Sequence, residues 1–110
     1  SRFVGLAKRF PRISWVLAHS GNALRGQIQA IDAAKACPNI YLETASSYGD
    51  YGTIESLVEG AGDDRVLYGS DMPLMDARYQ ISRIVSADIS DEAKRKVLGL
   101  NAIRLLGLDF

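Results

Sequence analysis

The chain has 110 residues, of which 47% are hydrophobic and 24% charged, and its 13 lysines and arginines balance its 13 aspartates and glutamates. This length allows at most one domain, and the composition is that of a globular protein. A net charge of zero without a basic run argues against nucleic acid and anionic lipid as partners, and no apolar run approaches the roughly 18 residues that a membrane span needs.

The first third of the chain predicts a helix, a strand and a second helix. Apolar side chains follow the i, i+3, i+4, i+7 spacing of a helix from Phe3 to Phe10, and Pro11 ends this pattern. Residues 13–18 are mostly apolar and predict a short strand. A second helix, in an Ala-rich stretch, is expected to end at Pro38. Its expected apolar stripe consists of Leu24, Ile28 and Ile31.

The middle of the chain predicts two more strands, at residues 40–44 and 66–70, with a helix between them. Thr53 is the expected N-cap of this helix, and Gly60 or Gly62 its end. Its apolar stripe consists of Ile54, Leu57, Val58 and Ala61.

Two further helices are predicted at the C-terminal end. The first has an apolar stripe that runs from Ala77 to Val85. Ser90, followed by two acidic residues, suits the N-cap of the second, which Gly99 is expected to end. Asn101 is then expected to cap a short last turn.

The three predicted strands recur at equal intervals, starting at Ser14, Ile40 and Val66. Apolar strands joined by helices are typical of a parallel sheet with right-handed crossovers. The predicted fold class is therefore α/β, although a βα repeat alone does not distinguish a barrel from an open doubly wound sheet.

Two strands end in residues that are suited to catalysis. The run Val66 to Ser70 leads directly into Asp71, and the neighbouring Gly and Pro residues predict a tight turn there. The strand before Ser20 leads into His19, the only histidine of the chain. In βα proteins the chemical groups sit at the carboxyl ends of strands, so these two residues predict part of an active-site rim.

Residues near the other strand ends are weaker candidates. Solvated surface arginine accounts for Arg25 and Arg78 better than binding of a substrate carboxylate, and Cys37 is expected to be buried rather than nucleophilic. Helix capping or loop hydrogen bonds explain the remaining four as well as substrate contact does. These four are Glu43, Thr44, Ser46 and Ser47.

Four segments carry a resemblance to a known family. They are residues 11–21, with a Pro-x-x-x-x-x-x-Ala-His-x-Gly pattern, and residues 38–44, 64–73 and 101–108. The most specific element is Gly-Ser-Asp-x-Pro at residues 69–73. In order and spacing they resemble the amidohydrolase-related metal-dependent hydrolases, a family that includes decarboxylases of the aminocarboxymuconate-semialdehyde type.

The resemblance implies the C-terminal part of a (β/α)8 TIM barrel, with strands six to eight and their helices. A whole barrel needs roughly 250 residues, so residues 1–110 are expected to be a single-domain fragment of a longer enzyme. The absent N-terminal part would carry a His-x-His pair and one more histidine as metal ligands, and His19 matches none of these.

The resemblance also implies roles for two residues. Asp71 would be a ligand of a divalent metal, expected to be zinc, whose bound water passes a proton to it. His19 would hydrogen-bond that water or the substrate as an acid, a base or an electrostatic stabiliser. On strand alternation His19 would share a face with Trp15 and Leu17. The alternatives are that Asp71 caps a turn and that backbone groups satisfy His19.

The expected function is hydrolysis of an ester, lactone or amide by a metal-activated water, and the isolated chain is expected to be inactive. The alternatives are a non-oxidative metal-dependent decarboxylase of the same family and a non-catalytic α/β binding module. Expected partners are a small-molecule substrate and either a second copy of the chain or the missing N-terminal part. A lone cysteine, with no signal peptide at the start, makes the cytoplasm the expected location.

Overall fold

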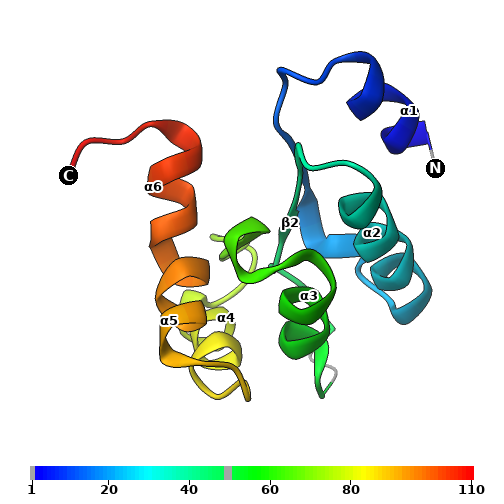
Figure 1. The fold of residues 1–110 in the computed structure, drawn as a ribbon. Helices are drawn as coiled ribbons and strands as arrows, with labels where there is room; N and C mark the ends of the chain where they lie inside the picture. Colours follow the sequence, from blue (N-terminus) through cyan, green and yellow to red (C-terminus); the bar gives the residue numbers. More distant parts are fainter. Residues whose placement is uncertain (1, 49–50) are drawn as a thin grey trace.

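A computed structural model describes residues 2–48 and 51–110 of the chain (Figure 1). Three parallel strands lie in the order β1 (Trp15–Leu17), β2 (Ile40–Glu43) and β3 (Val66–Leu67). Helices separate them along the sequence, so the predicted α/β architecture is confirmed. The predicted third strand is shorter than expected, because residues 68–70 leave the sheet before the turn at Asp71.

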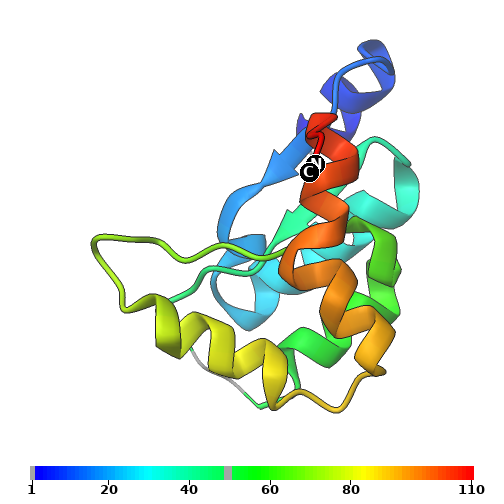
Figure 2. The ribbon, with the colours of Figure 1, turned by 90° about the vertical axis from the view of Figure 1, so that its left-hand side faces the viewer.

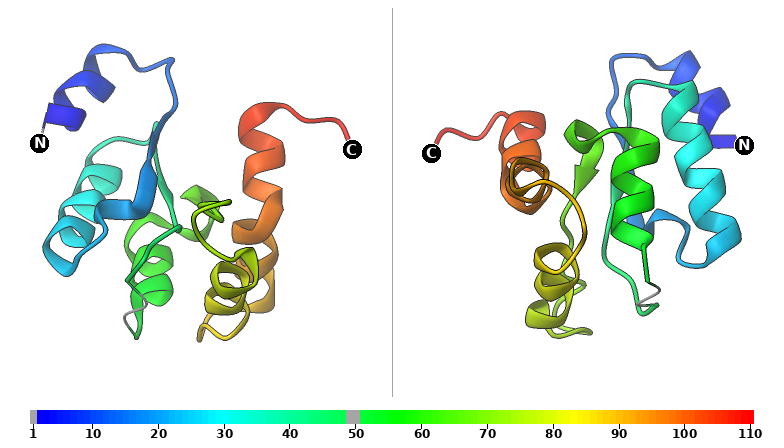
Figure 3. Two further views of the ribbon diagram at one scale, coloured as in Figure 1. Left: turned by 180° about the vertical axis from the view of Figure 1, so that it is seen from behind. Right: turned by 60° about the horizontal axis from the view of Figure 1, so that its bottom comes forward.

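The helices cover one face of this small sheet. Helix α1 (Arg2–Arg9) precedes β1, and α2 (Leu24–Ala36) and α3 (Thr53–Ala61) form the two crossovers. These two crossover helices lie side by side against the strands (Figure 3). A short turn, η2 (Asp63–Arg65), leads into β3, and α4 (Ala77–Val85) follows the long loop after it. Figure 2 shows this loop reaching away from the body of the molecule.

The last helical segment is longer than expected. Helix α5 (Asp91–Arg95) continues through a π-helical stretch, η3 (Lys96–Leu100), into α6 (Asn101–Leu106), and Gly107 ends it at a φ of 62°. The prediction that Gly99 breaks the helix is wrong, because glycine inside a helix costs only about 1 kcal/mol relative to alanine. The π turn also lets the Val97 carbonyl accept a hydrogen bond from the Tyr68 amide, at 2.9 Å.

Asn101 does not cap the last turn. Its side chain is fully buried, and Nδ2 donates to the carbonyl oxygens of Asp63, at 2.6 Å, and Val66, at 2.8 Å. Asn101 therefore ties the last helix to the start of β3.

The hydrophobic core lies between the sheet and the helices. Trp15 pairs with Ile40 and Leu17 with Leu42, and all four side chains pack toward the helices. From α2 the core receives Ala30, Ala33 and Ala34, and of the expected stripe only Ile31 packs against it. Of that stripe, Leu24 is 68% exposed and Ile28 is 53% exposed. Small side chains face the sheet because they let the helix approach it closely.

The other face of the sheet is not covered by helices. Val16, which pairs with Tyr41, points to it and is 46% exposed. By alternation along β2, Glu43 lies on the same face as Tyr41, at the carboxyl end of the middle strand. The candidate site lies at this end.

Candidate functional site

His19 lies just past the end of β1, in a tight turn (Ala18–Gly21) with left-handed backbone. The φ angles of His19 and Ser20 are 58° and 36°, a region that non-glycine residues rarely adopt. Two hydrogen bonds hold this turn: the His19 amide donates to Glu43 Oε2 at 2.8 Å, and Ser20 Oγ donates to the Glu43 carbonyl at 2.6 Å. The turn interrupts the strand alternation, so the expectation that His19 shares a face with Trp15 and Leu17 is wrong.

Glu43 connects the ends of all three strands. Besides the His19 amide of the β1 end, its carboxylate accepts a hydrogen bond from the Ala45 amide just after β2, at 2.5 Å. Gly69, just after β3, lies so close that an added Cβ would be 1.6 Å from Glu43 Oε1. Glycine at position 69 therefore leaves the space that the carboxylate fills.

From the sequence, loop hydrogen bonding and substrate contact explain Glu43 equally well, and the structure shows the loop hydrogen bonds. A signal was present in the alternation of β2. Ile40 and Leu42 are apolar and buried, whereas Tyr41 and Glu43 occupy the opposite face. An acidic residue on the uncovered face of the sheet, at the carboxyl end of a strand, is a stronger candidate for a site residue than an acidic residue in a loop.

The imidazole of His19 is held through one nitrogen only. Nδ1 lies 2.8 Å from the Ala45 carbonyl oxygen, and the side chain is 45% exposed. A carbonyl only accepts, so the neutral ring carries its proton on Nδ1 and keeps a lone pair on Nε2. Within residues 2–48 and 51–110, no hydrogen bond engages Nε2. The ring can therefore exchange a proton with a ligand at Nε2.

Asp71 lies in the loop after β3, with a φ of 56°. Its carbonyl oxygen accepts from the Met75 amide at 3.0 Å, and Ser70 Oγ accepts from the Met72 amide. The backbone and Ser70 thus form this turn, and no group in the described part of the chain donates to the Asp71 carboxylate. The carboxylate keeps its lone pairs for another ligand.

Among the described residues, no three His, Cys, Asp or Glu side chains come together in a way that could hold a metal ion. His19, Glu43 and Asp71 thus share one edge of the sheet without forming a metal site by themselves. A catalytic zinc site normally has three protein ligands. The Asp71 carboxylate is free to provide one of them, and no two further candidates come together with it among the described residues.

Three other sequence candidates, Thr44, Ser46 and Arg78, have structural partners. Thr44 Oγ1 accepts from the Gly69 amide at 3.3 Å, and Ser46 Oγ contacts Asn22 Oδ1 at 3.1 Å. Arg78 is highly exposed and pairs with Asp76, which lowers the pKa of the Asp76 carboxyl.

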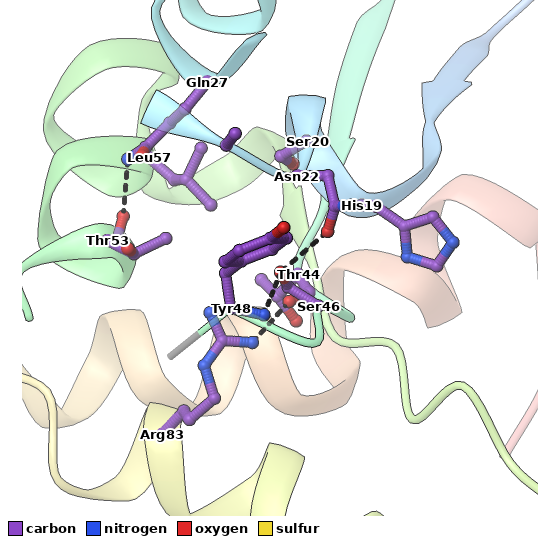
Figure 4. Close-up of a pocket in the computed structure, with 11 residues that line it drawn as sticks. His19, Ser20, Asn22, Gln27, Thr44, Ser46, Tyr48, Thr53, Leu57 and Arg83 are labelled. Carbon is purple, nitrogen blue, oxygen red and sulfur yellow. Dashed lines mark hydrogen bonds between the residues drawn. The ribbon is translucent and has the colours of Figure 1, made fainter. Parts of the chain in front are cut away.

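A small cavity adjoins the site between the turn η1 (Ala18–Gly21), the start of α3, and α4 (Figure 4). Its volume of about 20 Å³ suffices for a water molecule. Tyr48 and Arg83 line it, and the His19 ring points away from it in Figure 4. This cavity is too small for an organic molecule, and the His19 ring lies outside it.

A family model described as Amidohydrolase matches residues 2–108. The chain belongs to this family. The resemblance inferred from residues 69–73 and the other three segments is thereby confirmed. No curated protein sequence matches the chain.

Three solved structures show the fold. A 2,6-dihydroxybenzoate decarboxylase complexed with 2,6-dihydroxybenzoate has a TM-score of 0.76 and 21% identity, over 96% of this amidohydrolase-family chain and 38% of its own. Amidohydrolase 2 from Bifidobacterium longum subsp. infantis has a TM-score of 0.71 and 18% identity, and the match covers 97% of this chain and 46% of that protein. A dihydroxybenzoic acid decarboxylase from Polaromonas sp. JS666, with bound manganese and the inhibitor 2-nitroresorcinol, has a TM-score of 0.71 and 20% identity. The match covers 96% of this chain and 37% of the decarboxylase.

The chain thus spans less than half the length of these structures. Its three parallel strands and their helices form part of a TIM barrel, as predicted. In the described part of the chain, no helix has the length and apolarity that crossing a bilayer requires.

Proposed function

We propose that this segment belongs to a metal-dependent decarboxylase that acts on a hydroxylated aromatic carboxylic acid. The main support is the His19 imidazole at the carboxyl edge of the sheet, held through Nδ1 with Nε2 open to a ligand. Two of the three similar structures are decarboxylases of dihydroxybenzoic acids, and one of them contains manganese. We accordingly favour manganese or another divalent metal over a commitment to zinc.

Each residue of the site has a proposed role. Decarboxylation replaces a carbon–carboxylate bond with a carbon–hydrogen bond, so a proton must reach the ring carbon as carbon dioxide leaves. With its Nδ1 proton hydrogen-bonded to the Ala45 carbonyl, His19 accepts a proton at Nε2 and can pass it on to the ring carbon. Asp71 is one ligand of the metal, and Glu43 fixes the backbone that carries His19.

Hydrolysis of an ester, lactone or amide is the second candidate, and the description of the family model supports it. The same two residues would serve that reaction.

Barrel strands six to eight remain our assignment for this segment, with a second copy or an N-terminal part as its partner. A cytoplasmic location is also a proposal, supported by the single free and buried Cys37.

The test is made on the longer protein that we propose, with manganese present. Release of carbon dioxide from 2,6-dihydroxybenzoate supports the decarboxylase, whereas acid release from a lactone, without carbon dioxide release, supports the hydrolase. His19→Ala should lower kcat by about 10²- to 10⁴-fold and leave the metal bound. Asp71→Asn should reduce the metal content as well. Loss of metal in the His19 variant would make that histidine a ligand and contradict the roles proposed here.

A further inference from the structure

We propose that Gln80 and Arg83 of α4 are positioning residues for His19. They hold the backbone just after β2 so that one carbonyl of this segment faces the imidazole. The inference rests on the proposed function only for its catalytic meaning, because the geometry concerns this chain alone.

The two side chains grip two carbonyl oxygens of the same segment. Arg83 Nη1 donates to the Thr44 carbonyl at 2.7 Å, and Gln80 Nε2 donates to the Ser46 carbonyl at 2.9 Å. Gln80 is only 1% exposed, so bulk water does not compete for its bond to the Ser46 carbonyl, whereas Arg83 is partly exposed. Because α4 provides both donors, the segment after β2 is tied to this helix at two points.

The pair also fixes its own orientation. Arg83 Nη1 donates to Gln80 Oε1 at 2.8 Å, so the amide oxygen faces the guanidinium and the amide nitrogen faces the backbone. The reverse orientation of the amide would set nitrogen against nitrogen and oxygen against oxygen. Arg83 therefore selects the orientation of Gln80 that can hold the Ser46 carbonyl.

The Ala45 carbonyl, which lies between the hydrogen-bonded carbonyls of Thr44 and Ser46, points to His19. In an extended segment successive carbonyls point in opposite directions. With the carbonyls of Thr44 and Ser46 turned toward α4, the Ala45 carbonyl faces the imidazole, 2.8 Å from Nδ1. Glu43 Oε2 lies 4.0 Å from the same nitrogen, too far for a hydrogen bond. The Ala45 carbonyl is therefore the group that keeps the proton on Nδ1 and leaves Nε2 as the reactive nitrogen.

The tautomer of the histidine can be measured directly by ¹⁵N NMR on the 110-residue chain, because His19 is its only histidine. The spectrum is recorded at about pH 9, where an ordinary imidazole is neutral. We expect the Nδ1–H form to predominate in the natural chain. In Gln80→Leu and in Arg83→Met the ratio of Nδ1–H to Nε2–H should fall by about three- to tenfold, the bias that one hydrogen bond produces. Arg83→Lys, which keeps a donor, should restore part of it.

Two control variants separate positioning from general loss of stability. Arg78→Met removes an arginine from the same helix that pairs only with Asp76 among the described residues, and should leave the tautomer ratio unchanged. Val97→Ala removes a fully buried side chain that makes none of the hydrogen bonds of Gln80 and Arg83, and should lower Tm without changing the ratio.

A predominant Nε2–H form in the natural chain would overturn the inference. So would an unchanged ratio in Gln80→Leu and Arg83→Met, with Tm recorded to confirm that both variants are folded. A shifted ratio in these variants, together with full activity of His19→Ala in the longer protein, would support the positioning and contradict the proposed function instead.

Discussion

At the scale of single residues, the site depends on Glu43, which is charged, largely enclosed and shared by three strand ends. Its carboxylate accepts hydrogen bonds from the amides of His19 and Ala45 and lies against Gly69. Such an arrangement requires a carboxylate at one position and the absence of a Cβ at another. The effect on stability of a substitution at Gly69 should therefore depend on the side chain at position 43, and the reverse.

The contact between Gly69 and Glu43 can be tested with a double-mutant cycle. Gly69→Ala should lower the free energy of unfolding by about 1–3 kcal/mol, because the new Cβ displaces the carboxylate. In a Glu43→Ala background this loss should largely disappear, with a coupling energy of about 0.5–3 kcal/mol. Urea denaturation of the four proteins gives the cycle. Gly5→Ala is the control, because a Cβ there meets nothing within 4 Å and should be neutral or stabilising. Additive effects at Gly69 and Glu43 would contradict the arrangement.

At the scale of elements, polar side chains rather than apolar contacts alone attach the last helix to the sheet. Asn101 binds two backbone carbonyls around β3 from a fully buried position. Lys96 forms ion pairs with Asp63 and Asp64 of the η2 turn, each at 3.1 Å. Both residues bridge the helix and the segment that leads into β3.

Asn101→Ala should lower the free energy of unfolding by about 1–3 kcal/mol, because two buried carbonyls lose their donor. Thermal or urea unfolding measures this loss. Arg95→Ala, at an exposed position six residues earlier on the same helical segment, should change stability little. Equal effects of the two substitutions would show that the buried hydrogen bonds do not matter.

The ion pairs of Lys96 predict a pH dependence. The Lys96 ammonium lowers the pKa of Asp64 below 3.8, and Asp63 and Asp64 raise the pKa of Lys96 above 10.5. The stabilisation of the folded state is therefore complete between these two pH values. It is lost as the pH falls through the lowered pKa of Asp64, or rises through the raised pKa of Lys96.

Lys96→Met should accordingly lower Tm at pH 7, and the difference from the natural chain should shrink at acidic pH. Salt should also reduce the difference, because these side chains are partly exposed. Lys94→Met is the control, since Lys94 forms no ion pair in the described part of the chain. A Tm difference that is independent of pH would mean that Lys96 acts through packing alone.

At the scale of the whole molecule, the sheet has one covered and one uncovered face. Val16 is half exposed there, and β1 and β3 are edge strands with unpaired backbone groups. In a complete barrel other strands would cover both edges and enclose the inner face. We therefore expect the isolated chain to associate.

Sedimentation at micromolar concentration should show a dimer or a larger species. Val16→Lys, on the uncovered face, should weaken the association, whereas Leu106→Lys, at a position already 67% exposed on the last helix, serves as the control. A concentration-independent monomer with a cooperative melt would contradict this prediction and favour a self-contained α/β module.

The sequence by itself determined the order of the elements, because helical spacing and apolar strand runs are local patterns. It also predicted that His19 and Asp71 follow the first and third strands; His19 lies just past β1, whereas residues 68–70 separate Asp71 from β3. Spacing determined the parallel pairing, and motif resemblance determined the family, which the match over residues 2–108 confirmed.

Tertiary structure decided which side chains face each other. The alanine face of α2 packs on the sheet in place of Leu24 and Ile28, because close approach of a helix depends on its neighbours and not on its own hydrophobicity. Asn101 is buried because the Val66 carbonyl of β3 accepts from its Nδ2, and the π turn that contains Gly99 is joined to the segment after β3 because its Val97 carbonyl accepts from the Tyr68 amide. The hydrogen bonds of Gln80 and Arg83 to the segment after β2 join residues far apart along the chain, so only the folded backbone brings these donors and acceptors within hydrogen-bond distance.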